Sequence, residues 1–191
     1  MIEEARAKQI VGTPEIADAL RKYKFVTGQL FNTDVSDDYT FQEDYCKIYL
    51  PGNAYSEKFL IEFFRYLEAM KKESNISFRE AFEELKAIEG KNEMVAASVM
   101  VHTINPRFAI WDDQLAEDFF DINAPEKDAS VERCCRIYED FIDAFYAYAN
   151  SPEGMMMVHA FDSRFPNAEI PNLIKVGFII WAERVGIAND L

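Results

Sequence analysis

Histidine, glycine and cysteine are scarce in this sequence, and each shortage excludes a class of site. Only 2 His, 7 Gly and 3 Cys occur among its 191 residues. GxGxxG, P-loop and HExxH motifs are all missing, which excludes the common signatures of nucleotide and zinc-protease sites. The cysteines, Cys46, Cys134 and Cys135, lack the spacing of a zinc site or a disulfide framework. We therefore expect no metal and no cofactor.

The sequence also lacks long apolar runs and a surplus of positive charge. No run of about 18 apolar residues occurs, so we expect no transmembrane helix. The charged N-terminus has no signal-peptide core, and with the unpaired thiols it predicts a cytoplasmic protein. There are 20 Lys and Arg against 34 Asp and Glu, a net charge of -14. This charge repels phosphate, so nucleic acid and membrane are disfavoured as partners, whereas a protein partner stays open.

Aromatic residues and helical periodicity are abundant instead. The chain has 16 Phe and 9 Tyr, enough for a sizeable core. Apolar residues recur every three or four positions in several segments, most clearly over 55–72 and 131–149. No sustained alternation typical of strands occurs. The pattern predicts an all-α, compact multi-helix domain of about nine helices. We expect residues 1–191 to form a single domain, with residues 1–40 as an N-terminal arm or sublobe.

The most apolar segment predicts a buried central helix at about residues 93–104. It contains no charge between Met94 and Ile104, and Asn105-Pro106 is expected to end it. A capping box, Ser77 to Glu80, opens the helix before it, and Gly90 suits the left-handed position at that helix's end. Residues 32–44 carry five acids and no base, which predicts an exposed loop. Phe41, Tyr45 and Tyr49 recur every four residues, which predicts a short helix that ends at residues 51–53.

Two adjacent carboxylates, Asp112 and Asp113, stand at the start of the next predicted helix. One Asp there caps the helix, but a cap needs only one carboxylate. Asp112 is therefore the candidate catalytic residue and Asp113 the alternative, acting as a general base or stabilising a cation. The neighbouring Trp111 is a candidate for contact with a ring-shaped substrate. His102 is a further candidate for substrate contact, although a His within an apolar helix is more often a neutral core residue.

The stretch IEGKNEMVAASVMVHTINPRFAIWDDQLAEDFF, residues 88–120, resembles the core of the helix-hairpin-helix DNA glycosylase superfamily. The resemblance implies that Gly90 lies in the hairpin, Ala96–Val101 in the buried helix, and Asp112 at the family's Asp position. Lyase members place a Lys early in the buried helix, where this chain has Glu93 and Met94. The resemblance therefore implies a glycosylase-like fold and no amine nucleophile.

A second resemblance covers roughly residues 75–191. The runs INPRFAIWD, FDSRFP and FIIWAER are similar to motifs of a group of bacterial helical proteins for which no function carries over.

Three functions follow from these features. The first is a glycosylase-like domain that binds a base, nucleoside or related small ring, or that hydrolyses an N-glycosidic bond. The alternative is a non-enzymatic acidic helical module that binds a protein partner. Another form of that alternative is a DNA mimic that inhibits a nucleic-acid enzyme through carboxylates spaced like phosphates.

Overall fold

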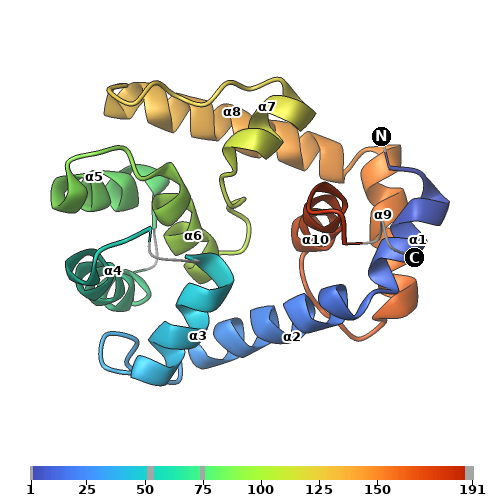
Figure 1. The fold of residues 1–191 in the computed structure, drawn as a ribbon, viewed down its shortest axis with the longest axis horizontal. Coiled ribbons are helices and arrows are strands. Elements are labelled where there is room, and N and C mark those ends of the chain that lie inside the picture. Colours follow the sequence, from blue (N-terminus) through green and yellow to red (C-terminus); the bar gives the residue numbers. More distant parts are fainter. Residues whose placement is uncertain (1, 51–53, 74–75, 188–191) are drawn as a thin grey trace. The chain divides into compact units, whose positions relative to one another are not determined.

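The computed structural model describes residues 2–50, 54–73 and 76–187, and within them the chain forms ten α-helices and no strand (Figure 1). This confirms the all-α prediction, with one helix more than the nine expected. The helices are α1 (Glu4–Val11), α2 (Pro14–Gln29), α3 (Tyr39–Tyr49), α4 (Glu57–Met70), α5 (Phe78–Glu89), α6 (Met94–Ile104), α7 (Asp113–Phe120), α8 (Val131–Ala149), α9 (Pro152–Arg164) and α10 (Asn172–Arg184).

Side-chain caps start six of these helices. In each case the cap is an Asp or Ser whose side-chain oxygen accepts a hydrogen bond from the amide three residues later, which satisfies an otherwise unpaired backbone donor. The caps of α3, α4, α5, α7, α8 and α9 are Asp38, Ser56, Ser77, Asp112, Ser130 and Ser151. At α5 the Ser77 hydroxyl also donates to Glu80 Oε2 at 2.8 Å, so the two side chains of the predicted capping box are in contact.

The central helix predicted at about 93–104 is α6. Its residues from Ala96 to Thr103 are all buried, and only Val95 is exposed. Ala96, Ala97 and Ser98 are small, so α5 packs closely against it. The helix ends where expected, because Asn105 precedes a proline and adopts an extended backbone with φ -133° and ψ 101°.

The loop predicted at residues 32–44 is shorter than expected. Residues 39–44 form the first half of α3, so the loop predicted from their acids is wrong there, whereas the helix predicted from the spacing of Phe41, Tyr45 and Tyr49 is found. Val35 is fully buried, and its amide donates to Glu68 on α4 at 3.0 Å. The Lys71 ammonium donates to the carbonyls of Leu30 and Thr33 at 2.9 and 2.6 Å. Composition suggested solvent exposure, but these contacts with α4 order the segment.

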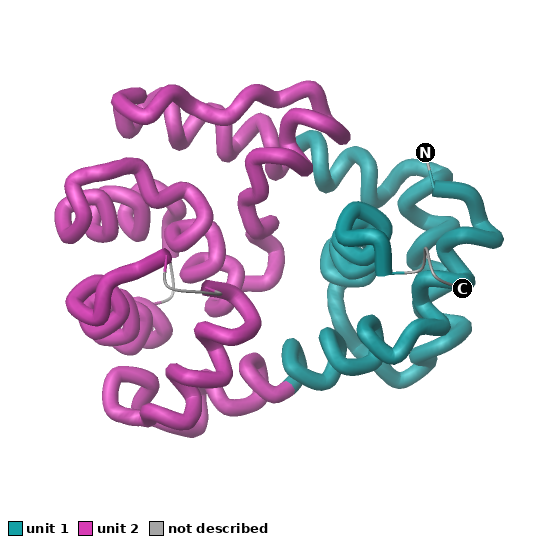
Figure 2. Tube along the Cα trace, in the orientation of Figure 1, with its two compact units in different colours: residues 1–24, 143–191 teal, residues 25–142 magenta. Residues whose placement is uncertain are grey.

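The chain divides into two compact units (Figure 2). Unit 1 comprises residues 1–24 and 143–191, in which α1 packs on α9 and α10. An ion pair of 2.7 Å between Arg6 and Glu183 joins α1 to α10 in this unit. Unit 2 comprises residues 25–142 and contains α3 to α7. Of the predicted arm, residues 1–24 therefore group with the C-terminal segment and residues 25–40 with the middle of the chain.

No helix within the described ranges is long and apolar enough to cross a membrane.

Candidate functional site

All four residues predicted for the site lie in unit 2, around the segment 108–111 that connects α6 to α7. This segment has no regular secondary structure, so its backbone groups need partners from elsewhere. Two partners come from α6. His102 Nδ1 lies 2.7 Å from the carbonyl oxygen of Phe108, and Ser98 Oγ accepts from the amide of Trp111 at 2.8 Å. A carbonyl only accepts, so His102 carries its hydrogen on Nδ1.

The third partner of the segment comes from α8. The Tyr138 hydroxyl donates to the carbonyl oxygen of Ala109 at 2.7 Å, and the Tyr138 ring stacks on Phe78 of α5 with centroids 3.8 Å apart. Ser98, His102 and Tyr138 are all buried. Three buried side chains therefore hold three backbone groups within four residues, immediately before Asp112.

Asp112 is the N-cap of α7, which confirms that one carboxylate of the pair caps the helix. Its backbone is extended, with φ -144° and ψ 118°, and Oδ1 accepts from the Leu115 amide at 2.8 Å. The residue is half-buried. Its carboxylate thus lies at the positive end of the α7 dipole, a place that suits a negative charge.

Asp113 is exposed and has a different task. Its Oδ1 accepts from the indole Nε1 of Trp111 at 2.5 Å. The Trp111 ring is only 1% exposed and packs edge-on against Phe141, with centroids 5.0 Å apart. With its faces covered, the indole is part of the core in this structure. Stacking of Trp111 on a ligand stays a prediction that requires the ring to leave its contacts.

His102 is 4% exposed and lies in the core of unit 2. Its ring is tilted against Tyr49, with centroids 6.2 Å apart. Burial lowers the pKa of His102 to about 4, because the imidazolium would lose its hydration, and the bond to Phe108 offsets only part of this effect. At neutral pH His102 is therefore uncharged, as expected for a His within an apolar helix.

The hairpin between α5 and α6 is closed by glycine and polar side chains. Gly90 adopts φ 71°, the left-handed conformation predicted for it. Asn92 Nδ2 donates to the carbonyl oxygens of Lys127 and Ala129, both at 3.2 Å. Glu93 is 7% exposed, and its Oε1 lies 2.8 Å from Lys91 Nζ. The residue just before α6 is therefore a buried carboxylate paired with a lysine.

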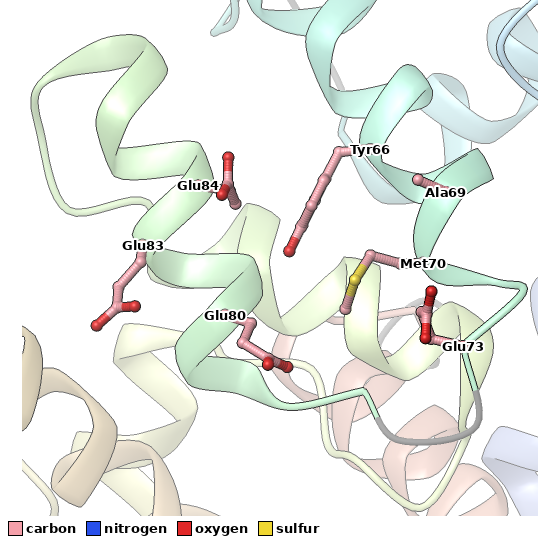
Figure 3. Close-up of a pocket in the computed structure, with 7 residues that line it drawn as sticks. All are labelled: Tyr66, Ala69, Met70, Glu73, Glu80, Glu83 and Glu84. Carbon is pink, nitrogen blue, oxygen red and sulfur yellow. The ribbon is translucent and has the colours of Figure 1, made fainter.

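A pocket of about 430 Å³ lies between α4 and α5, and the sequence analysis did not anticipate it (Figure 3). Figure 3 shows Tyr66 pointing from α4 into the space between the two helices. Burial raises the pKa of the Tyr66 hydroxyl, and the charges of Glu84 and Glu80 raise it further. The lining residues are Tyr66, Ala69, Met70, Glu73, Glu80, Glu83 and Glu84. In the sequence, only the spacing of Glu80, Glu83 and Glu84, which places them close together on one helix, could have indicated this acidic pocket.

The cysteines behave as core residues. Cys134 and Cys135 are buried on α8, and burial raises the pKa of both thiols, which suppresses the reactive thiolate. In the part of the chain that the structure covers, no group of three or more His, Cys, Asp or Glu side chains is placed to hold a metal ion.

Comparisons with known proteins leave the function to be inferred from these contacts. No protein-family model, curated protein or solved structure matches the chain.

Proposed function

We propose that unit 2 is a helix-hairpin-helix core of the DNA glycosylase type, which binds a base, nucleoside or related small ring beside Asp112 and hydrolyses an N-glycosidic bond. One observation carries the proposal. Asp112 stands at the start of α7, after a segment that buried side chains of α6 and α8 hold in place. A carboxylate fixed in this way suits an active site, because catalysis requires groups that are oriented before the substrate arrives.

The order of elements supports the glycosylase type. Helix α5 ends at the left-handed Gly90, a short hairpin follows, and the buried α6 packs against α5. The next helix begins with Asp112 at its N-cap. The resemblance of residues 88–120 implies the same succession of hairpin, buried helix and Asp. This resemblance of sequence supports a fold and not an activity, so the activity is inferred from the site.

The proposed chemistry needs a carboxylate and a water molecule. Asp112 stabilises the positive charge that develops on the sugar as the N-glycosidic bond breaks, or it activates the attacking water. Its charge remains available while one oxygen caps α7, because a hydrogen bond from the Leu115 amide does not neutralise it. Glu93 occupies the position of the lyase amine, so the chain hydrolyses the bond without forming a covalent imine.

The net charge of unit 2 indicates which class of substrate the site would accept. Residues 25–142 contain 12 Lys and Arg against 24 Asp and Glu, a net charge of -12 for unit 2. Binding of duplex DNA depends on cations that neutralise its phosphates, and this unit has a large excess of the opposite sign. A free base or a neutral nucleoside avoids the repulsion. We therefore assign the site a small neutral ring compound rather than duplex DNA.

The test compares two matched variants, Asp112→Asn and Asp113→Asn. Asn caps helices about as well as Asp, so Asp112→Asn keeps the cap and removes the charge. Asp113→Asn makes the same chemical change one residue away and keeps an acceptor for Trp111. Release of free base from a panel of neutral nucleosides is followed by chromatography, and thermal unfolding verifies that both variants fold.

We expect Asp112→Asn to reduce base release at least 100-fold, a typical loss when a charged catalytic group is neutralised, and Asp113→Asn to leave it nearly unchanged. Equal release by wild type and Asp112→Asn would remove Asp112 from the mechanism. Absence of release from every nucleoside by the wild-type protein would contradict the hydrolytic function.

A second function, an acidic module that binds a protein, is favoured by the pocket between α4 and α5. Within the described residues, the carboxylates of Glu73 and Glu84 make no ion pair or side-chain hydrogen bond, and Tyr66 and Met70 provide apolar surface between them. Such a surface fits a Lys or Arg side chain, whose alkyl stem packs on apolar groups while its charge meets carboxylates.

Binding of an oligolysine peptide, measured by calorimetry at low and high salt, tests this second function. We expect the affinity to fall with salt and to fall further in Glu84→Gln, whereas Asp113→Asn has no effect. Affinity that is the same in Glu84→Gln and in wild type would place the peptide elsewhere.

A further inference from the structure

The segment before Asp112 is held by more side-chain bonds than its length would suggest. The carbonyls of Phe108 and Ala109 and the amide of Trp111 each have a buried side-chain partner at 2.7 to 2.8 Å. The partners come from two different helices, α6 and α8. A connecting segment usually runs over the surface with its backbone solvated, whereas these three backbone groups are paired with buried side chains.

We propose that Ser98, His102 and Tyr138 are positioning residues, which fix the backbone of residues 108–111 and thereby set the place and direction of the Asp112 carboxylate. This inference rests on the function proposed above. Each of the three side chains bonds to a backbone group of the segment, and it acts on Asp112 through the chain that leads to that residue.

The contacts restrain the segment from both ends. His102 and Tyr138 hold the two carbonyls at its start, and Ser98 holds the Trp111 amide at its end. Ser98 also donates to the carbonyl of Val95 at 2.8 Å, so its hydroxyl has a fixed direction and presents a lone pair to Trp111. With positions 108, 109 and 111 fixed, the backbone of Asp112 has little freedom to turn.

If these hydrogen bonds had a purely structural role, removing one of them would have the same effect as removing any other buried hydrogen bond of unit 2. The chain offers such a bond for comparison. The Tyr45 hydroxyl bonds to Thr103 Oγ1 on α6 at 2.7 Å, also in the core of unit 2. Thr103 Oγ1 itself donates to the carbonyl of Val99, so Tyr45 is the donor. Tyr45→Phe therefore removes one buried tyrosine hydroxyl, which belongs to α3 and bonds to α6, without touching residues 108–111.

The experiment compares Tyr138→Phe with Tyr45→Phe in the full chain. The Phe ring preserves the stacking of Tyr138 on Phe78, and only the bond to Ala109 is lost. Amide hydrogen exchange of Trp111 and Leu115 reports on the segment and on the Asp112 cap without any need for activity. Base release provides kcat and KM for the same proteins.

We expect Tyr138→Phe to speed exchange of both amides roughly tenfold relative to Tyr45→Phe, the effect of losing about one buried hydrogen bond. We also expect it to lower kcat by a similar factor while KM is unchanged, because a misdirected Asp112 affects the reaction more than binding. Ser98→Ala should act in the same direction. Equal exchange at Trp111 and Leu115 in the two tyrosine variants would overturn the proposal.

The two proposals fail differently. If the wild-type protein releases no base, the proposed hydrolysis is wrong, and the exchange data still decide whether the three residues fix the segment. If base is released and Tyr138→Phe matches Tyr45→Phe in both kcat and exchange, the positioning role alone is wrong.

Discussion

The two compact units differ most in charge. Unit 2 has a net charge of -12, whereas unit 1, with 8 Lys and Arg against 10 Asp and Glu, has a net charge of only -2. Unit 2 also contains the buried His102, the acidic pocket and Asp112, whereas the other histidine, His159 of unit 1, is exposed. Both the proposed site at Asp112 and the acidic pocket therefore belong to the strongly acidic unit.

The largest expected change in stability comes from a substitution in unit 1, Gly154→Ala, and should affect that unit more than unit 2. A Cβ added at Gly154 of unit 1 would meet the carbonyl oxygen of Tyr148 in a severe clash and that of Ala149 at 2.6 Å. Both are backbone atoms that cannot move aside, so Gly154→Ala should destabilise unit 1 by about 3 kcal/mol. Gly177→Ala is the matched control, because its Cβ meets only the Phe145 ring at an ordinary 3.7 Å.

Tryptophan provides a reporter for each unit, since Trp181 lies in unit 1 and Trp111 in unit 2 and the chain has no other. In a urea titration followed by fluorine NMR of fluorotryptophan, Gly154→Ala should lower the midpoint of the Trp181 signal more than that of Trp111. An equal shift of both signals would mean that the units unfold as one.

The two histidines distinguish the units by their response to acid. His102 has a pKa of about 4 in the folded protein, below the usual value near 6.5. Between these values the unfolded chain binds the proton and the folded chain does not, so stability falls as the pH drops from 6.5 toward 4. This loss amounts to about 2 kcal/mol or more, given about 1.4 kcal/mol for each pKa unit.

His102→Gln should reduce this acid-dependent loss, whereas His159→Gln should leave it as in wild type, because His159 is exposed. Urea unfolding at pH 7 and pH 5 measures the difference. A wild-type pH dependence in His102→Gln would show that carboxylates rather than His102 dominate the acid response.

Replacing either of two glycines of unit 2 by alanine should change the stability of the protein, in opposite directions. Gly90 has φ 71°, which costs about 1 kcal/mol for a residue with a side chain, so Gly90→Ala should destabilise the hairpin by that amount. Gly28 lies in the last turn of α2 with open space around it, so Gly28→Ala should stabilise the protein by roughly 0.5 kcal/mol. Thermal unfolding measures both, and a loss of stability in Gly28→Ala would contradict the assigned helix.

The smallest expected effect concerns the electrostatics of the acidic pocket. Glu84 contributes to the raised pKa of Tyr66, and Glu83 does not. Glu84→Gln should therefore lower the pKa of Tyr66 toward its usual value near 10, with Glu83→Gln as the control. NMR titration of the Tyr66 ring carbon measures both, and identical values in the two variants would place the Glu84 charge too far away to matter.

Local signals in the sequence predicted much of the fold. The uncharged run from Met94 to Ile104, the left-handed Gly90 and the Ser77 cap all depend on residues within one or two turns, and all three are confirmed. The Asp112 cap is of the same kind. The acids of residues 39–44 suggested a solvated loop, whereas the spacing of Phe41, Tyr45 and Tyr49 predicted the helix that forms there, in which Phe41 is buried.

Long-range contacts account for what the sequence could not provide. The Tyr138 hydroxyl donates to the carbonyl of Ala109, which lies 29 residues earlier in the sequence, and no local sequence pattern predicts that hydrogen bond. Trp111 was chosen as a ring-binding residue from its place beside Asp112, but its burial depends on Phe141 of a different helix. The pocket between α4 and α5 likewise requires two helices to be placed side by side before the glutamates share a space.

The most direct test of the central claim is an NMR titration of the labelled wild-type protein with neutral nucleosides and, separately, with oligolysine. A site at Asp112 predicts that a nucleoside shifts the amide signals of residues 112–115 in a saturable way, while oligolysine leaves them in place and shifts those of α4 and α5. Nucleosides that leave residues 112–115 unmoved at millimolar concentration would contradict the assignment of Asp112 to a ring-binding site.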